Sequence, residues 1–242
     1  MNHFESDAWA YSHQGSRNDL SPEALEQGFG RVARYYSALL GHRLALREDL
    51  EILDIPCGEG EISYWLRSQG FKCLRGFDLD SSRIESGRRL GLPLHVGDAF
   101  GVLRQTRDNS LGAFFSLNFL EHLEKHQVIE FMTLVFDKLA PGGAFLVVTP
   151  CADSPFGSCH VFNDFTHKWA ATSGVLRGLF SGVGFAEVEV FGNHPRWQMS
   201  HGWIRVPLFK VATLLVNSFC TALGHRYTVW SASMWGMGRK PS

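Results

Sequence analysis

The chain has 242 residues and a mass of 27.1 kDa, with 45% hydrophobic and 19% charged residues. This composition is typical of a folded protein with one large core, and it excludes a collagen-like or disordered chain. The five cysteines form no CxxC pair and are odd in number, which excludes a complete disulfide framework. Lys and Arg (23) nearly balance Asp and Glu (24), so no nucleic-acid partner is expected.

Residues 1–48 are polar and predict a helical extension in front of the main domain, 49–242. The first seventeen residues contain no apolar run, so neither a secretory signal nor a membrane anchor is expected there. A helix is expected to begin at Ser21-Pro22-Glu23, because serine suits the N-cap and proline the first helical position. An apolar stripe with helical spacing follows: Leu25, Phe29, Val32, Tyr36 and Leu39.

From Glu51 onward, short apolar runs alternate with helical stretches. Helices are expected near 60–69, 81–89, 124–139 and 172–181. Strands are expected at 51–55, 73–79, 92–96, 111–117, 144–149, 186–191 and 227–236. Pro141-Gly142-Gly143 predicts a turn before the fifth strand. Such alternation predicts a doubly wound α/β fold with a mainly parallel seven-stranded sheet, an N-terminal helix and a late helical insertion at 193–226.

The insertion holds an apolar stretch, 203–223, of about the length that spans a bilayer. Four residues interrupt it: Arg205, Pro207, Lys210 and Asn217. A buried helix, or one that makes peripheral contact with a membrane, fits this pattern better than a span.

The first strand ends in Asp54-Ile55-Pro56-Cys57-Gly58-Glu59-Gly60, at the edge where parallel sheets bind ligands. The glycines let a ligand approach the backbone, and the acidic residue before them suits a cationic ligand such as S-adenosylmethionine. A nicotinamide dinucleotide would need a third glycine, where Ser63 stands. A tight turn with incidental glycines is the alternative.

Two further carboxylates end the next strands. Asp78 lies eighteen residues beyond Gly60, about the interval at which a carboxylate accepts the hydroxyls of a ribose. Asp98 can accept the amino group of an adenine while Phe100 covers the ring, although taken alone Asp98 also suits a helix cap.

The strings ILDIPCGEG, GFDLDSS, VGDAF, NFLEHL and LAPGGAFLVVTP resemble, in order and spacing, the motif series of class I S-adenosylmethionine-dependent methyltransferases over residues 50–192. Pro56 departs from that pattern, which usually has glycine there. The resemblance implies S-adenosylmethionine as cofactor. It implies cofactor contacts from Asp54, Pro56, Cys57, Gly58, Gly60, Asp78, Leu79, Asp98, Ala99, Phe100, Asn118 and Glu121.

The segment TPCADSPFGSCHVFNDFTHKWAATSGVLRGLFSGVGF resembles a subgroup encoded with polysaccharide and O-antigen biosynthesis enzymes, with Cys151 in place of its usual asparagine. It implies an enzyme that methylates an oxygen of a sugar or glycan intermediate, including a lipid-linked one. The alternatives are a non-catalytic cofactor- or glycan-binding protein of this fold and a methyltransferase for another small molecule. The cysteine usage favours the cytoplasm, and the stretch 203–223 adds peripheral contact with the inner face of the membrane as an alternative to a wholly cytoplasmic protein.

Methyl transfer to a hydroxyl needs alignment and a proton acceptor. His167, with Asp164 to orient it, is the candidate base; alternatively, Asp164 and Thr166 cap the next helix and His167 packs beside it. His122, after the fourth strand, is the rival base. His160, Asp164 and His167 lack the spacing of a metal motif, so no metal is predicted.

Overall fold

The structure is a computed structural model that describes residues 21–44, 46, 49–155, 157–194, 201–224 and 228–242. Its strands are β1 (Glu51–Asp54), β2 (Leu74–Asp78), β3 (Leu94–Val96), β4 (Leu111–Leu117), β5 (Leu139–Pro150), β6 (Ala186–Gly192) and β7 (Ser233–Arg239). They form one seven-stranded sheet in the order β3-β2-β1-β4-β5-β7-β6. Strands β1 to β5 pair in parallel, and β7 pairs antiparallel with both β5 and β6. The predicted doubly wound fold is therefore confirmed.

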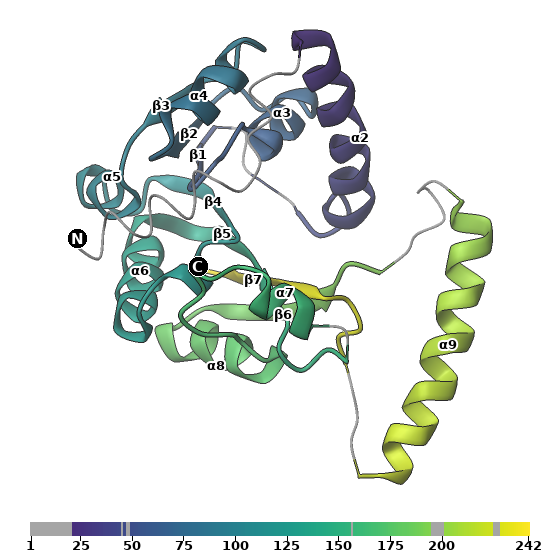
Figure 1. Cartoon of the computed structure of the whole chain (residues 1–242). Helices are drawn as coiled ribbons and strands as arrows, with labels where there is room; N and C mark the ends of the chain where they lie inside the picture. Colours follow the sequence, from purple (N-terminus) through teal and green to yellow (C-terminus); the bar gives the residue numbers. More distant parts are fainter. Residues whose placement is uncertain (1–20, 45, 47–48, 156, 195–200, 225–227) are drawn as a thin grey trace.

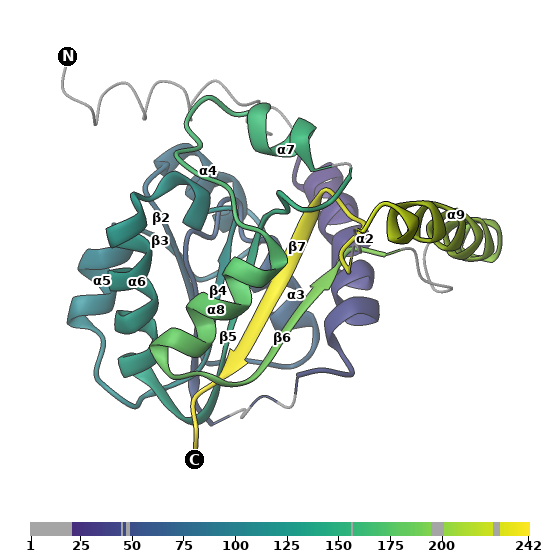
Figure 2. The same ribbon diagram turned by 90° about the horizontal axis from the view of Figure 1, so that it is seen from below.

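Helices cover both faces of the sheet (Figures 1 and 2). One face carries α2 (Pro22–Leu40), α3 (Glu61–Ser68) and α4 (Ser81–Arg88), and the other α5 (Ala99–Gln105), α6 (Lys125–Lys138) and α8 (Ser173–Val183). Two short elements, η1 (Leu120–His122) and α7 (Ser158–Phe162), follow β4 and β5 along the chain. Both lie on the path toward the carboxyl edge of the sheet, where ligands bind in this fold class.

Helix α2 begins where the sequence predicts. The Ser21 hydroxyl accepts a hydrogen bond from the Ala24 N–H, and Pro22 needs no such acceptor because it has no N–H. The predicted stripe faces the core, with Val32 only partly buried. The fully buried members of α2 are Leu25, Phe29, Ala33, Tyr36, Leu39 and Leu40.

Two expectations along the sheet are wrong. The residues Pro141-Gly142-Gly143 form no turn before the fifth strand, because β5 already begins at Leu139 and contains them. Gly142 adopts φ +76°, and the pairing of β4 with β5 shifts beside Leu111, so these residues make an irregularity within the strand pair. The last strand, expected over 227–236, begins at Ser233 and ends at Arg239; Tyr227 lies outside the described residues.

Helix α9 (Gly202–Ala222) connects β6 to β7 in the chain and stands apart from the body of the molecule (Figure 1). Pro207 lies inside it without ending it. Among the described residues, α9 is a helix whose length and apolar composition would suffice to cross a membrane. Its large apolar side chains point outward, with Leu214, Leu215 and Phe219 each about two-thirds exposed. The expectation that this helix is buried against the sheet of its own chain is therefore wrong, whereas burial in a dimer seam stays an alternative.

Candidate active site

The carboxyl ends of the central strands open into a cavity of about 660 Å³, a volume that suits a nucleoside-sized ligand. Tyr36 of α2 and Arg83 of α4, which the sequence did not mark as site residues, also line this cavity. The cavity wall includes nine residues predicted for the site: Asp54, Pro56, Cys57, Gly58, Asn118, Glu121, His122, Asp164 and His167.

The loop after β1 is tied to the end of β2 through Asp78. One carboxylate oxygen of Asp78 accepts the N–H of Gly58 at 2.8 Å, and the other accepts the N–H of Asp80 at 2.9 Å. Gly58 adopts φ +53° and Gly60 φ +88°, which glycine tolerates without strain. A Cβ atom on Gly60 would lie 2.9 Å from the side chains of Leu92 and Leu94, so this glycine lets the turn pack closely.

Asp54 on the cavity wall, with the buried carboxylate of Asp78 nearby, makes this side of the cavity suited to a cation. Burial raises the pKa of Asp54 to about 8, whereas the Ser63 hydroxyl, at 3.2 Å, and the Ser63 backbone N–H act in the opposite direction. Burial also raises the pKa of Asp78, although its two backbone donors act in the opposite direction. A ligand with a positive charge would favour the ionised form of Asp54. The residues present therefore fit S-adenosylmethionine, which carries an ammonium and a sulfonium.

The residues expected on the adenine side lie elsewhere. Leu79, Asp98 and Phe100 line a separate hollow of about 310 Å³. Asp98 caps α5, since its carboxylate accepts the Gly101 N–H at 2.7 Å. The ring of Phe100 packs edge-on against Phe131 with centroids 5.8 Å apart. Three further predicted residues, Gly60, Asp78 and Ala99, are buried and line neither space.

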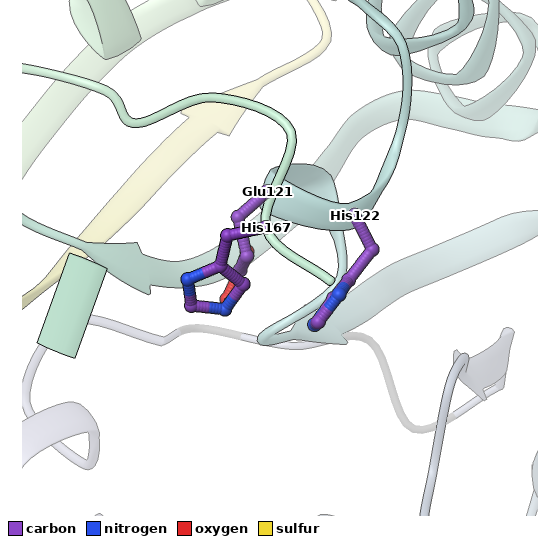
Figure 3. A group of neighbouring side chains, drawn as sticks. All are labelled: Glu121, His122 and His167. Atoms are coloured by element: carbon purple, nitrogen blue, oxygen red, sulfur yellow. The ribbon is translucent and has the colours of Figure 1, made fainter. Parts of the chain in front are cut away.

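Glu121, His122 and His167 come together on the cavity wall (Figure 3). The first two belong to η1, and His167 lies in the loop between α7 and α8. The two imidazole rings meet edge-on with centroids 4.9 Å apart, and the Nε2 atom of His167 lies 4.0 Å from Glu121 Oε1. We name this group the His–Glu cluster.

Two hydrogen bonds fasten the loop that carries His167 to backbone carbonyls of η1. The Lys168 N–H donates to the backbone carbonyl of Glu121 at 2.9 Å. The indole N–H of Trp169 donates to the carbonyl of Leu120 at 2.8 Å. These contacts fix the two halves of the His–Glu cluster relative to each other.

Each imidazole is oriented through its Nδ1 atom. His167 Nδ1 lies 2.8 Å from the Val161 carbonyl oxygen, which can only accept, so Nδ1 carries the proton. His122 Nδ1 lies 2.8 Å from the Thr166 hydroxyl, and that hydroxyl donates its own proton to Asp164 at 2.7 Å. In both rings, Nε2 is therefore the nitrogen with the lone pair.

The expectation that Asp164 orients His167 is thereby corrected, because the Val161 carbonyl does so. Asp164 Oδ1 accepts both the N–H and the hydroxyl of Thr166. Its other oxygen, Oδ2, lies 3.9 Å from His167 Nε2. The alternative that Asp164 and Thr166 cap the next helix is also wrong, because Thr172 caps α8. Sequence reasoning missed Val161, since a backbone carbonyl leaves no mark in the residue type.

Glu121 is buried, with 1% of its surface exposed, and this burial raises its pKa to about 7. Within the part of the chain that the structure describes, neither carboxylate oxygen has a hydrogen-bond partner. The Thr149 hydroxyl acts to lower the pKa but does not meet hydrogen-bond geometry. A buried carboxylate in this state is costly and is a mark of a functional site.

The chain is similar to known methyltransferases in sequence and in fold. A family model described as a methyltransferase domain matches residues 26–190. The fold is similar to a SAM-dependent methyltransferase from Archaeoglobus fulgidus, with a TM-score of 0.65 and 19% identity over 89% of this chain and 98% of that one. It is similar to an S-adenosylmethionine-dependent methyltransferase from Mesorhizobium loti, with a TM-score of 0.58 and 17% identity over 85% and 97% of the two chains.

A third similar structure is phosphoethanolamine N-methyltransferase 2 from Haemonchus contortus in complex with S-adenosyl-L-methionine. Its TM-score is 0.59 at 16% identity, over 100% of this chain and 59% of that one. No curated protein sequence matches the chain. At these identities the structures establish the fold, while the family model covers both loops of the His–Glu cluster.

Proposed function

The chain belongs to the methyltransferase-domain family as an S-adenosylmethionine-dependent methyltransferase, and we propose that it methylates a hydroxyl oxygen of a sugar or glycan intermediate. Bound S-adenosylmethionine supplies the methyl group as an electrophile. The protein's part is to align an acceptor in line with the breaking carbon–sulfur bond and to receive a proton.

The observation that carries this proposal is the Nε2 lone pair of His167 at the wall of the cavity. A hydroxyl must lose its proton as its oxygen bonds to the methyl carbon, whereas a neutral amine needs no base before it attacks. His167 Nε2 is the proton acceptor in this proposal, with its tautomer held by the Val161 carbonyl.

The choice of a sugar rests on the lining of the acceptor side. Beyond the His–Glu cluster, the cavity wall includes Asn118, His160, Asn163 and Ser233. These side chains offer both donors and acceptors, as a hydroxyl-rich acceptor requires. The DFTH-containing segment, which resembles enzymes encoded with polysaccharide biosynthesis, supports the same choice.

We also propose that the protein works from the cytoplasm at the inner face of a membrane, where lipid-linked acceptors reside. Helix α9 is apolar on its exposed sides, carries Arg205 and Lys210 in its first half and contains no acidic residue. Such a helix suits the interface of an anionic bilayer, with the cations at the headgroups and the apolar side chains below them. All five cysteines are unpaired, as in a reducing compartment.

Mass spectrometry of the surface glycan tests the proposed function, with and without the gene in the organism that carries it. The expected result is one sugar that is lighter by one methylene unit when the gene is absent. An unchanged glycan, from a protein that still binds S-adenosylmethionine, would overturn the glycan acceptor. That result would point to another small molecule or to a binding protein without chemistry.

A further inference from the structure

We propose that the His–Glu cluster binds one divalent transition-metal ion at the acceptor side of the cavity, and that this ion binds the oxygen to be methylated. The inference rests on the proposed function for the identity of the acceptor atom, but the ion site itself rests on the geometry of Glu121, His122 and His167.

The spacing of the ligand atoms fits a single ion. One ligand atom from each of the three side chains lies within 4.8 Å of the other two. Metal–ligand distances of about 2.1 Å place tetrahedral ligands about 3.4 Å apart, so small side-chain rotations would close the triangle. All three side chains line the cavity, which leaves room for an acceptor oxygen in a further coordination position.

The ligand types select the class of metal. Two imidazoles and one carboxylate form the donor set of catalytic zinc sites and of non-haem iron sites with open positions. Magnesium and calcium prefer oxygen ligands and are disfavoured here. Two neutral imidazoles and one carboxylate carry a total charge of −1, so the site with a bound dication has a net charge of +1.

The surroundings hold both imidazoles in the form that binds metal. His167 donates from Nδ1 to the Val161 carbonyl, and His122 donates from Nδ1 to the Thr166 hydroxyl. Asp164 in turn accepts the Thr166 proton. Hydrogen bonds of this kind from the distal nitrogen are what fix the tautomer and ring orientation of metal-binding histidines.

The buried carboxylate supplies the second, independent observation. Glu121 is 1% exposed, and among the described residues neither of its oxygens finds a hydrogen-bond donor. A buried charge is tolerated when it is paired or coordinates a metal. An ion between the three side chains would provide the partner that this carboxylate lacks.

The ion changes how the acceptor loses its proton. A hydroxyl bound to a divalent ion becomes more acidic, as metal-bound water does. Its proton passes to a water molecule in the cavity, the oxygen forms its bond to the methyl carbon, and the electrons of the carbon–sulfur bond go to sulfur. The products are the methyl ether, S-adenosylhomocysteine and a proton. With the ion bound, water takes the part that the proposed function gives to the free Nε2 of His167, so the metal content of the active enzyme distinguishes the two routes.

Cobalt(II) is the probe of choice, because its visible absorption reports the ligand set directly. The full chain is stripped with a chelator and titrated with Co²⁺ and Zn²⁺, with absorption and calorimetry as readouts. We expect one equivalent to bind and the visible bands of a nitrogen–oxygen site to appear. Glu121→Gln and His167→Ala each remove a metal ligand. Their affinity for the metal should fall by at least 10–100-fold, which is the loss expected when only a hydrogen bond to a ligand is removed.

Two further variants make the test specific. Thr166→Val removes the acceptor for His122 Nδ1 and should weaken metal binding by about 10–100-fold while all three ligands remain. His126→Ala, an exposed histidine on α6, is the matched control and should bind metal as the wild type does. Variants are compared only where their thermal unfolding and S-adenosylhomocysteine binding show a folded protein.

The outcomes separate the ion site from the proposed function. If the wild type binds no Co²⁺ or Zn²⁺, or if Glu121→Gln and His167→Ala bind as His126→Ala does, the ion site is wrong. If chelator-treated enzyme methylates the acceptor as fast as untreated enzyme, the ion has no part in the reaction and His167 remains the base. A wild type that binds the ion but methylates no sugar would overturn the proposed function and leave the ion site standing.

Discussion

The carboxylate of Asp78 at the end of β2 accepts the backbone N–H of Gly58 in the loop after β1, at a distance of 2.8 Å. This hydrogen bond joins the two strand ends that face the cofactor side of the cavity. The same carboxylate also accepts the Asp80 N–H, so it holds the loop after β1 against the end of β2.

We expect Asp78→Ala to weaken S-adenosylmethionine binding by roughly 10–100-fold, because charge-assisted hydrogen bonds to the ribose are lost. Isothermal titration calorimetry measures the change. Asp137→Ala removes an exposed carboxylate on α6 and serves as the control. Unchanged affinity in a folded Asp78→Ala protein would refute the ribose assignment.

Asp54→Asn should stabilise the protein without cofactor, and more so at alkaline pH. The pKa of Asp54 rises from an ordinary value of 3.8 to about 8 in the fold, so the folded state holds a proton that the unfolded state releases. The free energy of unfolding of the wild type therefore falls from about pH 4 to pH 8, and the variant escapes this loss. Thermal unfolding at pH 5 and pH 9 checks the prediction.

Bound S-adenosylmethionine should reverse that advantage, because the cation favours ionised Asp54. At pH 8 the ligand should raise the melting temperature of the wild type more than that of Asp54→Asn. An equal rise in melting temperature in the two proteins would show that Asp54 does not interact with the cationic part of the cofactor.

His167→Ala should leave S-adenosylmethionine binding near the wild-type value and lower turnover by about 10²–10⁴-fold, because the variant loses the base in the metal-free enzyme and a ligand in the metal-bound one. In the proposed function the strand ends hold the cofactor, whereas the acceptor lies beside His167, in the loop between α7 and α8. Release of S-adenosylhomocysteine with the acceptor measures turnover, and His126→Ala is the control. Wild-type turnover in His167→Ala would move the base to His122.

The wild type should float with anionic vesicles in a density gradient. The double variant Arg205→Gln, Lys210→Gln should bind the vesicles roughly 30-fold more weakly, because each cation near the surface contributes about 1 kcal/mol. Leu215→Asp should abolish binding, whereas Ile129→Asp, an exposed apolar position on α6, should not. A wild type that stays at the bottom of the gradient and elutes as a dimer would show that a second copy covers α9.

The central part of the fold was predictable from residue patterns, because strand ends, caps and turns are local. Ser21 caps α2 through the Ala24 N–H, as its position before Pro22 predicted. The boundaries of β7 were not predictable, since glycine disfavours strands. Gly236 and Gly238 stand in β7 because a Cβ atom there would lie within 2.8 Å of Leu176 or Phe180 of α8.

The sequence predicted the members of the His–Glu cluster as site residues but not that they contact one another. Glu121 and His122 were marked by the motif after β4, and His167 by the DFTH box, but their meeting depends on how two loops pack. The metal group considered from spacing, with His160, is not the one that the fold assembles: His160 Nδ1 lies 3.4 Å from Ser233 instead. Local spacing carries no information on such contacts.

Strand β6 ends at Gly192, which pairs with Met234 at the start of β7, and Ser233 pairs with Pro150 at the end of β5. The chain therefore leaves for α9 and returns from it at the same edge of the sheet as the cavity mouth. A bilayer that held α9 would thus also keep that mouth close to the lipid surface. Encounter with a lipid-linked acceptor would become a search in two dimensions, in which even a weakly bound sugar is met at high local concentration.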